Sequence, residues 1–535
     1  MLQNRGLTEP ADYKLFLEAG LPADTDPFLL PDIQPAIGRI YRALLSGEKI
    51  IVYGDFDVDG ITSTALLVES IKALGGEAEP YIPHRLTEGY GLKSAAIESL
   101  RKQGAGLIIT CDCGVTAIPE VKKARKLGLD IVITDHHTPL DELPPAIAVV
   151  DPKRTDSHYP FTGLAGVGVA LKLVQALFRG LGKEEKPDNL LDLVTLGTVA
   201  DIVPLLGENR YLVKKGLRVL NNTTRLGIKE LMLQSGLTEG SIDSVKISWV
   251  IAPRLNTPGR LEHALASYQL LTTDSPEEAK ELSVWLERKN VERQKMTQEA
   301  MNLAREQVAK EERAPVLFVT AEEFPAGVNG LVAGRLSEEY YRPAVVVRRG
   351  EFWSTGSCRS IPEFNIVNAL RQNHSLLSHY GGHAQAAGFT LPTRNLGQLK
   401  RNLLESAAVE LSGVELRPHI DIDMRVGLAD IGGRKTYDLM QKLAPFGEGN
   451  PAPVFLSCGV SVLDCRTMGN NGEHLRLKLK QGNTVWNGVA FGLGNYIGEI
   501  VSDIDVVYNL EIDRWNGNEN LRLNILDFGK TSNRK

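Results

Sequence analysis

The chain has 535 residues, 43% of them hydrophobic and 24% charged, with a formal net charge of −6 and a pI near 6.0. This composition excludes a disordered chain, and the length predicts three or four domains. The negative charge argues against indiscriminate coating of nucleic acids, so local basic patches must bind any polyanion. No apolar run approaches the roughly 20 residues of a membrane span. Five cysteines without disulfide-like spacing predict a cytoplasmic protein.

Residues 1–45 are expected to form a helical lead-in that prolines divide into short pieces. From residue 46 to residue 274, short apolar runs alternate with helix-like segments, which predicts an α/β domain with a parallel sheet. The first strand is expected to end at Tyr53, and helices are expected near residues 62–74, 93–102 and 119–127.

Polar clusters with carboxylates follow three of the predicted strands. They are Asp55-Phe-Asp57-Val-Asp59-Gly60, Cys111-Asp112-Cys113-Gly114 and Asp135-His136-His137. In an extended backbone the three carboxylates of the first cluster would project to one side. Taken singly, the first cluster could be an acidic turn and the histidine pair could be structural. However, the carboxyl ends of parallel strands meet at one edge of a sheet, so three such clusters together predict a metal site. The two cysteines are interpreted as packing residues because a zinc site would need a second pair.

A buried helix is expected over residues 190–199, just before Asp201. A cation near Asp201 would offset the unfavourable interaction of its carboxylate with the helix dipole. Gly163, Gly166 and Gly168 precede another apolar helix, and they would either cradle a phosphate or allow close helix packing. Their spacing matches neither nucleotide-loop pattern, which favours packing.

The segment Ser275-Pro276-Glu277-Glu278 combines a capping box with proline at the first helical position. It predicts a connecting helix within residues 275–313 that runs from Pro276 to about Lys310, roughly 50 Å at 1.5 Å per residue. Because the middle of this segment is nearly all polar, we expect it to cross between two domains.

A second α/β domain is expected over residues 314–410, with strands near residues 316–320, 344–347 and 352–360 and a Gly381-Gly382-His383 turn. From residue 411 to residue 535, short alternating segments with a tight turn at Asn516-Gly517 predict a small β-barrel of the OB-fold type. Its aromatic side chains could stack on bases while its basic side chains follow the backbone of a single strand, or the aromatic side chains could belong to the barrel core. They are Trp486, Phe491, Tyr508, Trp515, Arg476, Lys478, Lys480, Arg514 and Arg522.

Together with Ala200-Asp201-Ile202-Val203-Pro204-Leu205, the three polar clusters resemble the four ordered motifs of the DHH phosphoesterase superfamily. Later motifs resemble those of the bacterial RecJ exonuclease family, and the resemblance runs from about Phe28 to the C-terminus. These motifs are Arg254-Leu-Asn256-Thr-Pro-Gly-Arg260, Gly356-Ser357-Cys-Arg359-Ser360, Gly381-Gly382-His383-Ala384 and Ala386-Ala-Gly-Phe389. The resemblance implies a DHH domain over residues 46–274, a DHHA1 domain over residues 314–410 and an OB-fold over residues 411–535.

The resemblance also implies hydrolysis by two divalent ions, Mn²⁺ or Mg²⁺. One ion would use Asp57 and Asp112 with Asp55, the other would use Asp59, Asp112, His136 and Asp201, and Asp112 would bridge them. His137 would face the phosphate. The implied substrate-binding residues are Arg85, Arg254, Asn256, Arg260, Ser357, Arg359, Gly382 and His383.

The activity implied by the resemblance is degradation of single-stranded DNA from the 5′ end to mononucleotides, in DNA repair and recombination. The protein is expected to be a monomer that does not associate with a membrane. Its expected protein partners are a single-strand-binding protein and a helicase. An enzyme acting on short RNAs or cyclic dinucleotides is one alternative, but it would not need the long helix and the barrel. A non-catalytic replication scaffold is another, and the complete set of predicted ligands argues against it.

Overall fold

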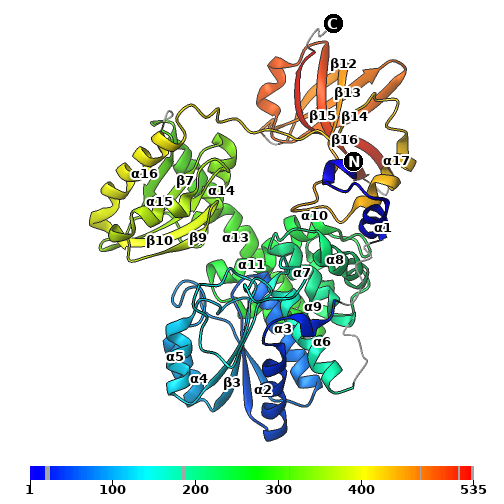
Figure 1. Ribbon diagram of the computed structural model, residues 1–535. Coiled ribbons are helices and arrows are strands. Elements are labelled where there is room, and N and C mark those ends of the chain that lie inside the picture. Colours follow the sequence, from blue (N-terminus) through cyan, green and yellow to red (C-terminus); the bar gives the residue numbers. More distant parts are fainter. Residues whose placement is uncertain (19–24, 183–187, 312–313, 470, 516–517, 532–535) are drawn as a thin grey trace.

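The computed structural model describes the chain from residue 1 to residue 531 except residues 19–24, 183–187, 312–313, 470 and 516–517. Three sheets lie in three separate units, which we call the first domain, the second domain and the barrel domain (Figure 1). The predicted turn at residues 516–517 lies outside the described residues. Within these ranges, none of the helices combines the length and the apolar character that a membrane crossing requires.

The first domain is built on a five-stranded sheet of order β2-β1-β3-β4-β5, in which every pairing is parallel. Along β1, Ile50 and Val52 face one hydrophobic core while Ile51 and Tyr53 face the other, so both faces of the sheet are buried. This arrangement explains the continuous apolar runs of the sequence. The strands are β1 (Lys49–Tyr53), β2 (Ala78–Tyr81), β3 (Ala105–Cys111), β4 (Asp130–Thr134) and β5 (Ala148–Val150).

Helices α4 and α5 cover one face of this sheet, and the larger helical layer covers the other. Helix α2 packs in the larger core through Ala36 and Ile40, so the second half of the expected lead-in is structurally part of the first domain. The helices are α1 (Pro10–Glu18), α2 (Ile33–Ser46), α3 (Val58–Ala73), α4 (Ser94–Lys102), α5 (Ile118–Lys126), α6 (Gly166–Gly180), α7 (Leu191–Ala200), α8 (Gly207–Leu220), α9 (Leu226–Gln234), α10 (Ser244–Lys246), the π-helix η4 (Ile247–Ile251), α11 (Ala252–Leu261) and α12 (Leu265–Thr272).

The predicted connecting helix is α13 (Pro276–Val308), a single helix of 33 residues. The Ser275 side chain accepts a hydrogen bond from the Glu278 backbone N–H at 3.2 Å, which confirms the predicted cap. Its N-terminal half packs in the first core through Leu286, and its C-terminal half packs against β6 and β7 through Met301 and Ala304. The helix therefore joins the first and second domains.

The second domain has a mixed sheet of order β6-β7-β8-β10-β9. The predicted Gly381-Gly382-His383 turn is wrong, because these residues form an exposed edge strand that pairs with β10. The elements are β6 (Leu317–Ala321), α14 (Asn329–Tyr340), β7 (Ala344–Arg348), β8 (Trp353–Arg359), α15 (Ile366–Gln372), β9 (His379–His383), β10 (Ala386–Pro392) and α16 (Leu396–Glu410).

The barrel domain closes through the pairing of β12 with β15, which gives the five-stranded barrel expected of an OB-fold. Tyr508 is fully buried in its core, whereas Phe491 is half exposed and lies against His474 with ring centroids 5.2 Å apart. The elements are β11 (Met424–Arg425), α17 (Gly433–Met440), β12 (Phe455–Met468), β13 (His474–Gln481), β14 (Thr484–Ala490), β15 (Asp503–Trp515) and β16 (Asn518–Lys530).

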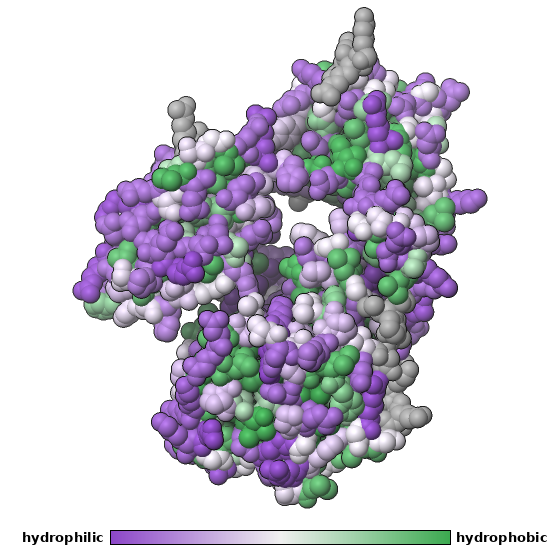
Figure 2. Space-filling model, viewed as in Figure 1, coloured by the Kyte–Doolittle hydropathy of each residue, from purple (hydrophilic) through white to green (hydrophobic). Residues whose placement is uncertain are grey.

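The three domains surround an opening that passes through the molecule in Figure 2. The N-terminal segment closes one side of this ring, since Arg5 pairs with Asp423 of the barrel domain at 3.1 Å. A second contact is direct, because the Leu205 N–H donates to the Glu448 carbonyl at 2.8 Å. The barrel domain thus rests on the loop that follows Asp201.

Candidate metal centre

Potential metal ligands converge at the carboxyl edge of the first sheet. Asp55 follows β1, Asp112 follows β3, His136 follows β4 and Asp201 caps the C-terminal end of α7. In each of three overlapping groups the ligand atoms all lie within 4.8 Å of one another. The groups are Asp55, Asp57 and Asp112; Asp59, His136 and Asp201; and Asp112, His136 and His137. Because Asp112 and His136 each occur twice, the groups form one continuous cluster.

The carboxylates of residues 55–59 are not arranged on an extended strand as the sequence predicts. Helix α3 begins at Val58, four residues earlier than expected, and Asp57 is its N-cap. The Asp57 side chain accepts hydrogen bonds from the N–H groups of Asp59 at 3.0 Å and Gly60 at 3.2 Å. This cap turns the chain, so Asp59 reaches the cluster from the first turn of the helix.

Asp59 is held by the N-terminus of α6. Its two carboxylate oxygens accept hydrogen bonds from the N–H groups of Gly166 at 2.6 Å and Val167 at 2.8 Å. A Cβ atom on Gly166 would lie only 2.9 Å from the Asp112 Cβ atom, so glycine allows this close approach. The glycine-rich helix entry therefore binds a carboxylate of the cluster.

His136 lies at the centre of the cluster. Its Nε2 atom is 3.1 Å from Asp112 Oδ1, 3.6 Å from Asp201 Oδ2 and 3.9 Å from Asp59 Oδ2. Within the described part of the chain, Asp55 Oδ1 and Asp201 Oδ2 are buried and have no hydrogen-bond partner. Unsatisfied buried carboxylate oxygens are costly, and divalent cations would satisfy them.

Burial sets the electrostatics of this cluster. It raises the pKa of Asp59 to about 7, with a further contribution from the charge of Asp57. Burial, followed by the charge of Asp59, holds the pKa of Asp112 and of Asp201 well above the usual range. Burial also lowers the pKa of His136 to about 3. The His136 imidazole is therefore neutral, and the carboxyl groups around it resist ionisation because they are buried and their negative charges would repel one another. Bound divalent cations would remove this penalty and favour the ionised carboxylates.

Two non-glycine residues of the centre have left-handed backbones. Asp112 has φ 60° and Ile202, directly after Asp201, has φ 59°. This conformation is unfavourable for a β-branched residue such as isoleucine, and the side chain of Ile202 is also 70% exposed. Backbone strain of this kind persists where the surrounding structure fixes a functional geometry.

The sequence prediction assigned no role to Asp135, which positions His137. Asp135 Oδ1 accepts a hydrogen bond from the His136 N–H and lies 2.8 Å from His137 Nδ1. Burial lowers the pKa of His137, but its contact with Asp135 outweighs burial and leaves the pKa raised. The His137 ring also stacks on His383 of the second domain, with centroids 6.4 Å apart and planes 9° apart. Asp135 belongs to the third polar cluster of the sequence, and this position is the signal that could have identified its role.

Arginines gather beside the metal centre. Arg85 lies over the ring of Phe56 at 4.7 Å. Burial and the charges of Arg85, Arg293 and Arg359 lower the pKa of Arg260 to about 9. Guanidinium groups that destabilise one another in this way would be stabilised by an anion. The sequence does not predict the position of Arg293 on α13, because a polar helix gives no sign of which face lies beside Arg260.

The remaining predicted substrate residues have varied surroundings. Arg254 forms an ion pair with Glu287 of α13, and the Asn256 side chain accepts a hydrogen bond from the Val58 N–H at 3.0 Å. These contacts brace α11 against α13 and against the start of α3. Ser357 shares the Arg359 face of β8, and Gly382, with φ 136°, lies in β9 beside His383.

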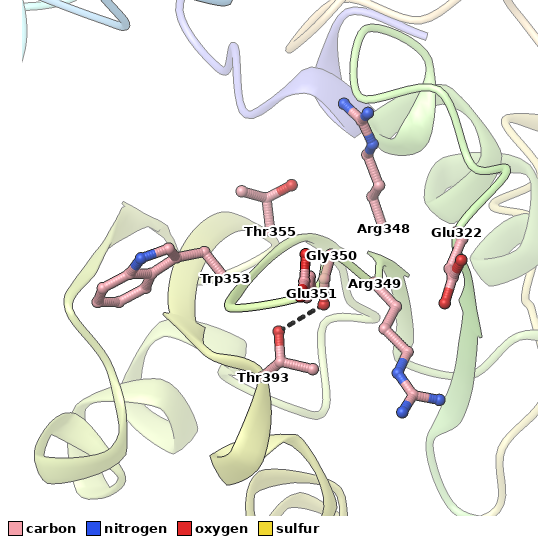
Figure 3. A pocket seen from close by; sticks show the side chains of 8 residues that line it. All are labelled: Glu322, Arg348, Arg349, Gly350, Glu351, Trp353, Thr355 and Thr393. Carbon is pink, nitrogen blue, oxygen red and sulfur yellow. Dashed lines mark hydrogen bonds between the residues drawn. The ribbon is translucent and has the colours of Figure 1, made fainter.

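A cavity of about 810 Å³ opens elsewhere in the second domain, around the turn between β7 and β8 (Figure 3). Its lining carries both charges, and Figure 3 shows the side chains of Arg348 and Arg349 extending in different directions. The predicted metal ligands and substrate residues are absent from this lining, which consists of Glu322, Arg348, Arg349, Gly350, Glu351, Trp353, Thr355 and Thr393.

The parallel sheet and the carboxylate–histidine cluster at its edge define a DHH-type phosphoesterase fold. Three family models agree: the DHH family N-terminal domain matches residues 49–198, the DHHA1 domain matches residues 313–409, and the RecJ OB domain matches residues 422–527.

The chain belongs to the RecJ family. It is 38% identical over 532 residues to the single-stranded-DNA-specific exonuclease RecJ of Bacillus subtilis (strain 168), covering 98% of this chain and 67% of that protein. It is 32% identical to the RecJ exonuclease of Haemophilus influenzae, covering 96% of this chain and 93% of the relative. The crystal structure of RecJ in complex with Mn²⁺ from Thermus thermophilus superposes with a TM-score of 0.85 at 30% identity, covering 99% of this chain and 75% of that chain.

Proposed function

We propose that this protein is a metal-dependent exonuclease that degrades single-stranded DNA from the 5′ end to mononucleotides. The observation that carries the proposal is the buried cluster in which Asp112 and His136 each belong to two groups of potential ligands. Oxygen ligands with one imidazole suit Mn²⁺ or Mg²⁺. The named activity of the relatives and the solved complexes of RecJ with Mn²⁺ and with Mg²⁺ support the same interpretation.

The residues of the cluster would hold two ions. Asp55, Asp57 and Asp112 would bind one, and Asp59, Asp112, His136 and Asp201 would bind the other. When bound, such a pair supplies Lewis-acid activation of water and neutralises charge that develops on the phosphodiester.

His137 would donate a hydrogen bond to the scissile phosphate. Asp135 supports this role because it fixes the orientation of the His137 ring and favours its protonated form.

The arginines would anchor the 5′ end. Arg85, Arg260, Arg359 and His383 would bind the terminal phosphate, and Ser357 and Gly382 would shape the site on β8 and β9. Arg254 and Asn256 would act through their contacts with Glu287 and Val58. An end anchored next to the metal centre presents only its first linkage, which would account for exonuclease action.

The cellular setting is also part of the proposal. Five free cysteines suit a reducing cytoplasm, and a monomer would suffice because the predicted ligands all come from one chain. A helicase and a single-strand-binding protein would supply the substrate during repair and recombination. In this proposal, residues 1–45 are the lead-in, residues 46–274 the catalytic domain and residues 275–313 the connecting helix. Residues 314–410 bind the 5′ end, and residues 411–535 bind the strand.

The test uses 5′- and 3′-labelled single strands with Mn²⁺ or Mg²⁺. We expect mononucleotides from the 5′ end and loss of at least about 10³-fold in kcat for Asp112→Asn, with strand binding retained. Lys126→Met, on the exposed surface of α5, is the control. An Asp112→Asn variant within tenfold of the parent, equivalent to about 1.4 kcal/mol of barrier, would refute the shared-ligand role. Cleavage of cyclic dinucleotides or short RNAs in preference to long DNA would support the alternative enzyme.

A further inference from the structure

Five arginines between the metal centre and helix α14 form no ion pair within the described part of the chain. Arg254, by contrast, pairs with Glu287 in the same region. Charged side chains that are partly buried are costly unless an opposite charge compensates them, so the five indicate an anionic ligand. We call them the arginine row: Arg85, Arg260, Arg293, Arg335 and Arg359.

Arg293 lies midway along α13, between the two domains that this helix joins (Figure 1). Leu286 packs in the first core, and Met301 packs against β6 and β7. Asn290 and Thr297, on the same side of the helix as Arg293, are each 1% exposed. One terminal nitrogen of Arg293 donates to Asn290 Oδ1 at 2.9 Å, but its Nε atom is buried without a hydrogen-bond partner. An anionic acceptor at this position would satisfy that donor.

Helix α14, which packs on α13, brings two more guanidinium groups to this place. The Arg359 side chain lies along a glycine face of α14, because a Cβ atom would be 3.3 Å from its terminal nitrogen at Gly330 and 3.9 Å from its Cγ atom at Gly334. The next residue, Arg335, is exposed. Burial, followed by the charge of Arg335, lowers the pKa of Arg293.

The arginine row leads away from the metal centre. Burial lowers the pKa of Arg85, and the charge of Asp55 at the metal centre opposes this effect. Arg260 is affected by the charge of Arg85 on one side and by that of Arg293 on the other. Arg293 is in turn affected by Arg335. Arg293 and Arg335 therefore lie beyond the arginines that we assign to the terminal phosphate.

A terminal phosphate carries a charge of about −1.5 to −2 at pH 7. Bound by Arg85, Arg260 and Arg359, it would leave Arg293 and Arg335 without an anion. We propose that Arg293 and Arg335 form a second anion site, which binds the two outer phosphates of a 5′-triphosphorylated strand. This inference rests on the proposed exonuclease function. Such ends are the product of nucleotide polymerisation that starts without a primer.

Cleavage at such an end has a distinct first product. Hydrolysis breaks the bond between the scissile phosphorus and the 3′ oxygen of the first nucleotide. The hydroxyl group of the attacking water joins the phosphorus, and a proton passes through solvent to the 3′ oxygen. The released product is a nucleoside 5′-triphosphate, and the shortened strand begins with a 5′ monophosphate. The second anion site therefore acts only in the first turnover on each strand.

The experiment compares strands that differ only at the 5′ end. Substrates are 20-nucleotide single strands of one sequence with a 5′ hydroxyl, a 5′ monophosphate or a 5′ triphosphate. Arg335→Gln and Arg293→Gln each remove one charge of the proposed site. Arg305→Gln is the matched control, because Arg305 lies on the same helix and pairs with Glu339 of α14. First-turnover kinetics give KM and kcat, and chromatography identifies the first product.

The parent should cleave the triphosphorylated strand with a KM no higher than that for the monophosphorylated strand, and it should release a nucleoside triphosphate first. Arg335→Gln and Arg293→Gln should raise KM for the triphosphorylated strand at least about tenfold more than KM for the monophosphorylated strand, because their charge-assisted hydrogen bonds reach only the added phosphates. Arg305→Gln should match the parent on both strands. Since Arg335 is exposed, its substitution decides the matter even if Arg293→Gln does not fold.

Equal losses on the two phosphorylated strands in Arg335→Gln would overturn the proposal. A parent KM for the triphosphorylated strand more than tenfold above that for the monophosphorylated strand would overturn it as well. Calorimetric titration with inorganic tripolyphosphate and with inorganic phosphate, without divalent ions, separates this inference from the proposed function. If the parent cleaves none of the strands, the exonuclease proposal fails, whereas tighter binding of tripolyphosphate that is lost in Arg335→Gln still supports the second anion site. Equal binding of tripolyphosphate by the parent and Arg335→Gln would refute it.

Discussion

Arg359 lies at the C-terminal end of β8, where one guanidinium nitrogen donates to the Cys358 carbonyl at 2.8 Å. Its other terminal nitrogen lies beside Gly330 of α14: a Cβ atom added to this glycine would be 3.3 Å from that nitrogen. Burial and the charge of Arg85 lower the pKa of Arg359. An anion beside these two arginines would relieve both penalties, which is why we assign the 5′ phosphate to this position.

Replacement of Arg359 by glutamine should therefore impair recognition of the 5′ end. We expect KM for 5′-phosphorylated strands to rise at least about tenfold more than KM for 5′-hydroxyl strands, because a charge-assisted hydrogen bond contributes about 1.5 to 3 kcal/mol. Steady-state kinetics with the two substrates measure the difference. Arg349→Gln, on the exposed turn of the same domain, should change neither value. Equal losses on both substrates would assign Arg359 to the general path of the backbone.

At the residue scale, the sequence predicts which carboxylates and histidines lie together, because strand ends in a parallel sheet necessarily share an edge. It does not identify their supports. The N–H donors of Gly166 and Val167 belong to a helix more than 100 positions from Asp59, and no local pattern links them. The pairing of His137 with His383 likewise depends on how two domains face each other.

Helix α2 is joined to the first sheet by a buried arginine. Arg39 is 6% exposed, and it contacts Glu48 and Asp130 at 2.6 Å each. The hydrogen bond from Arg39 is the largest cause of the lowered pKa of Glu48. A carboxylate whose pKa is lower in the folded state stabilises the fold above its unfolded pKa, and this contribution is lost as pH falls through the folded pKa.

Arg39→Met should accordingly destabilise the first domain more at neutral than at acidic pH. We expect the free energy of unfolding to fall by about 2 kcal/mol at pH 7, since hydrogen bonds to charged groups are lost. The fall should be smaller at pH 4, where Glu48 is largely protonated in the unfolded chain and its ionised contact with Arg39 therefore stabilises the fold less. Urea denaturation at both pH values, followed by circular dichroism, measures the change. Lys126→Met, which alters an exposed lysine on α5, is the control. An equal loss at both pH values would show that Glu48 does not contribute.

Element types follow the sequence closely where the pattern is periodic or capped. The helix from Pro276 is a case in point, because Ser275 and Pro276 define its start locally. The sequence predicts a later start for α3 because nothing in it shows that the Asp57 carboxylate, a potential metal ligand, also caps the helix through its Oδ1 atom. The edge strand β9 was interpreted as a turn because its glycines, typical of turns, are here paired with β10.

The arrangement of the three domains depends on contacts across very long separations in the chain. Arg210 of α8 is 2% exposed and donates to the carbonyls of Phe16 at 3.0 Å and Leu443 at 2.8 Å. It also lies 3.9 Å from the centre of the Phe16 ring. One side chain of the first domain thus binds both the N-terminal segment and the barrel domain. The partners of Phe16 and Arg5 lie some 200 and 400 positions further along the chain, so the sequence predicts only a helical lead-in over residues 1–45.

This junction also affects how removal of the barrel domain should be interpreted. Deletion of residues 412–535 would remove the partners of Arg5 and Arg210 together with the proposed strand-binding surface. It would also free the loop after Asp201, because Leu205 would lose the Glu448 carbonyl. Reduced capture of long strands by such a truncation would therefore combine lost binding with a disturbed metal centre, and a point substitution separates the two better.

Arg210→Met should loosen the barrel domain without removing it. Loss of the guanidinium leaves the carbonyls of Phe16 and Leu443 without their donor, and we expect the docked state to be destabilised by about 2 kcal/mol. Cleavage of the connection between α16 and β11 by a low concentration of protease should accelerate at least about tenfold. KM should rise for 20-nucleotide strands while kcat on a dinucleotide stays near the parent value, because Arg210 touches none of the proposed ligands.

Arg218→Met, on the exposed face of the same helix, should match the parent in both assays. If Arg210→Met reduces dinucleotide turnover as strongly as long-strand cleavage, the junction acts mainly by holding the loop that carries Asp201. The barrel domain would then stabilise the metal centre as much as it binds the strand.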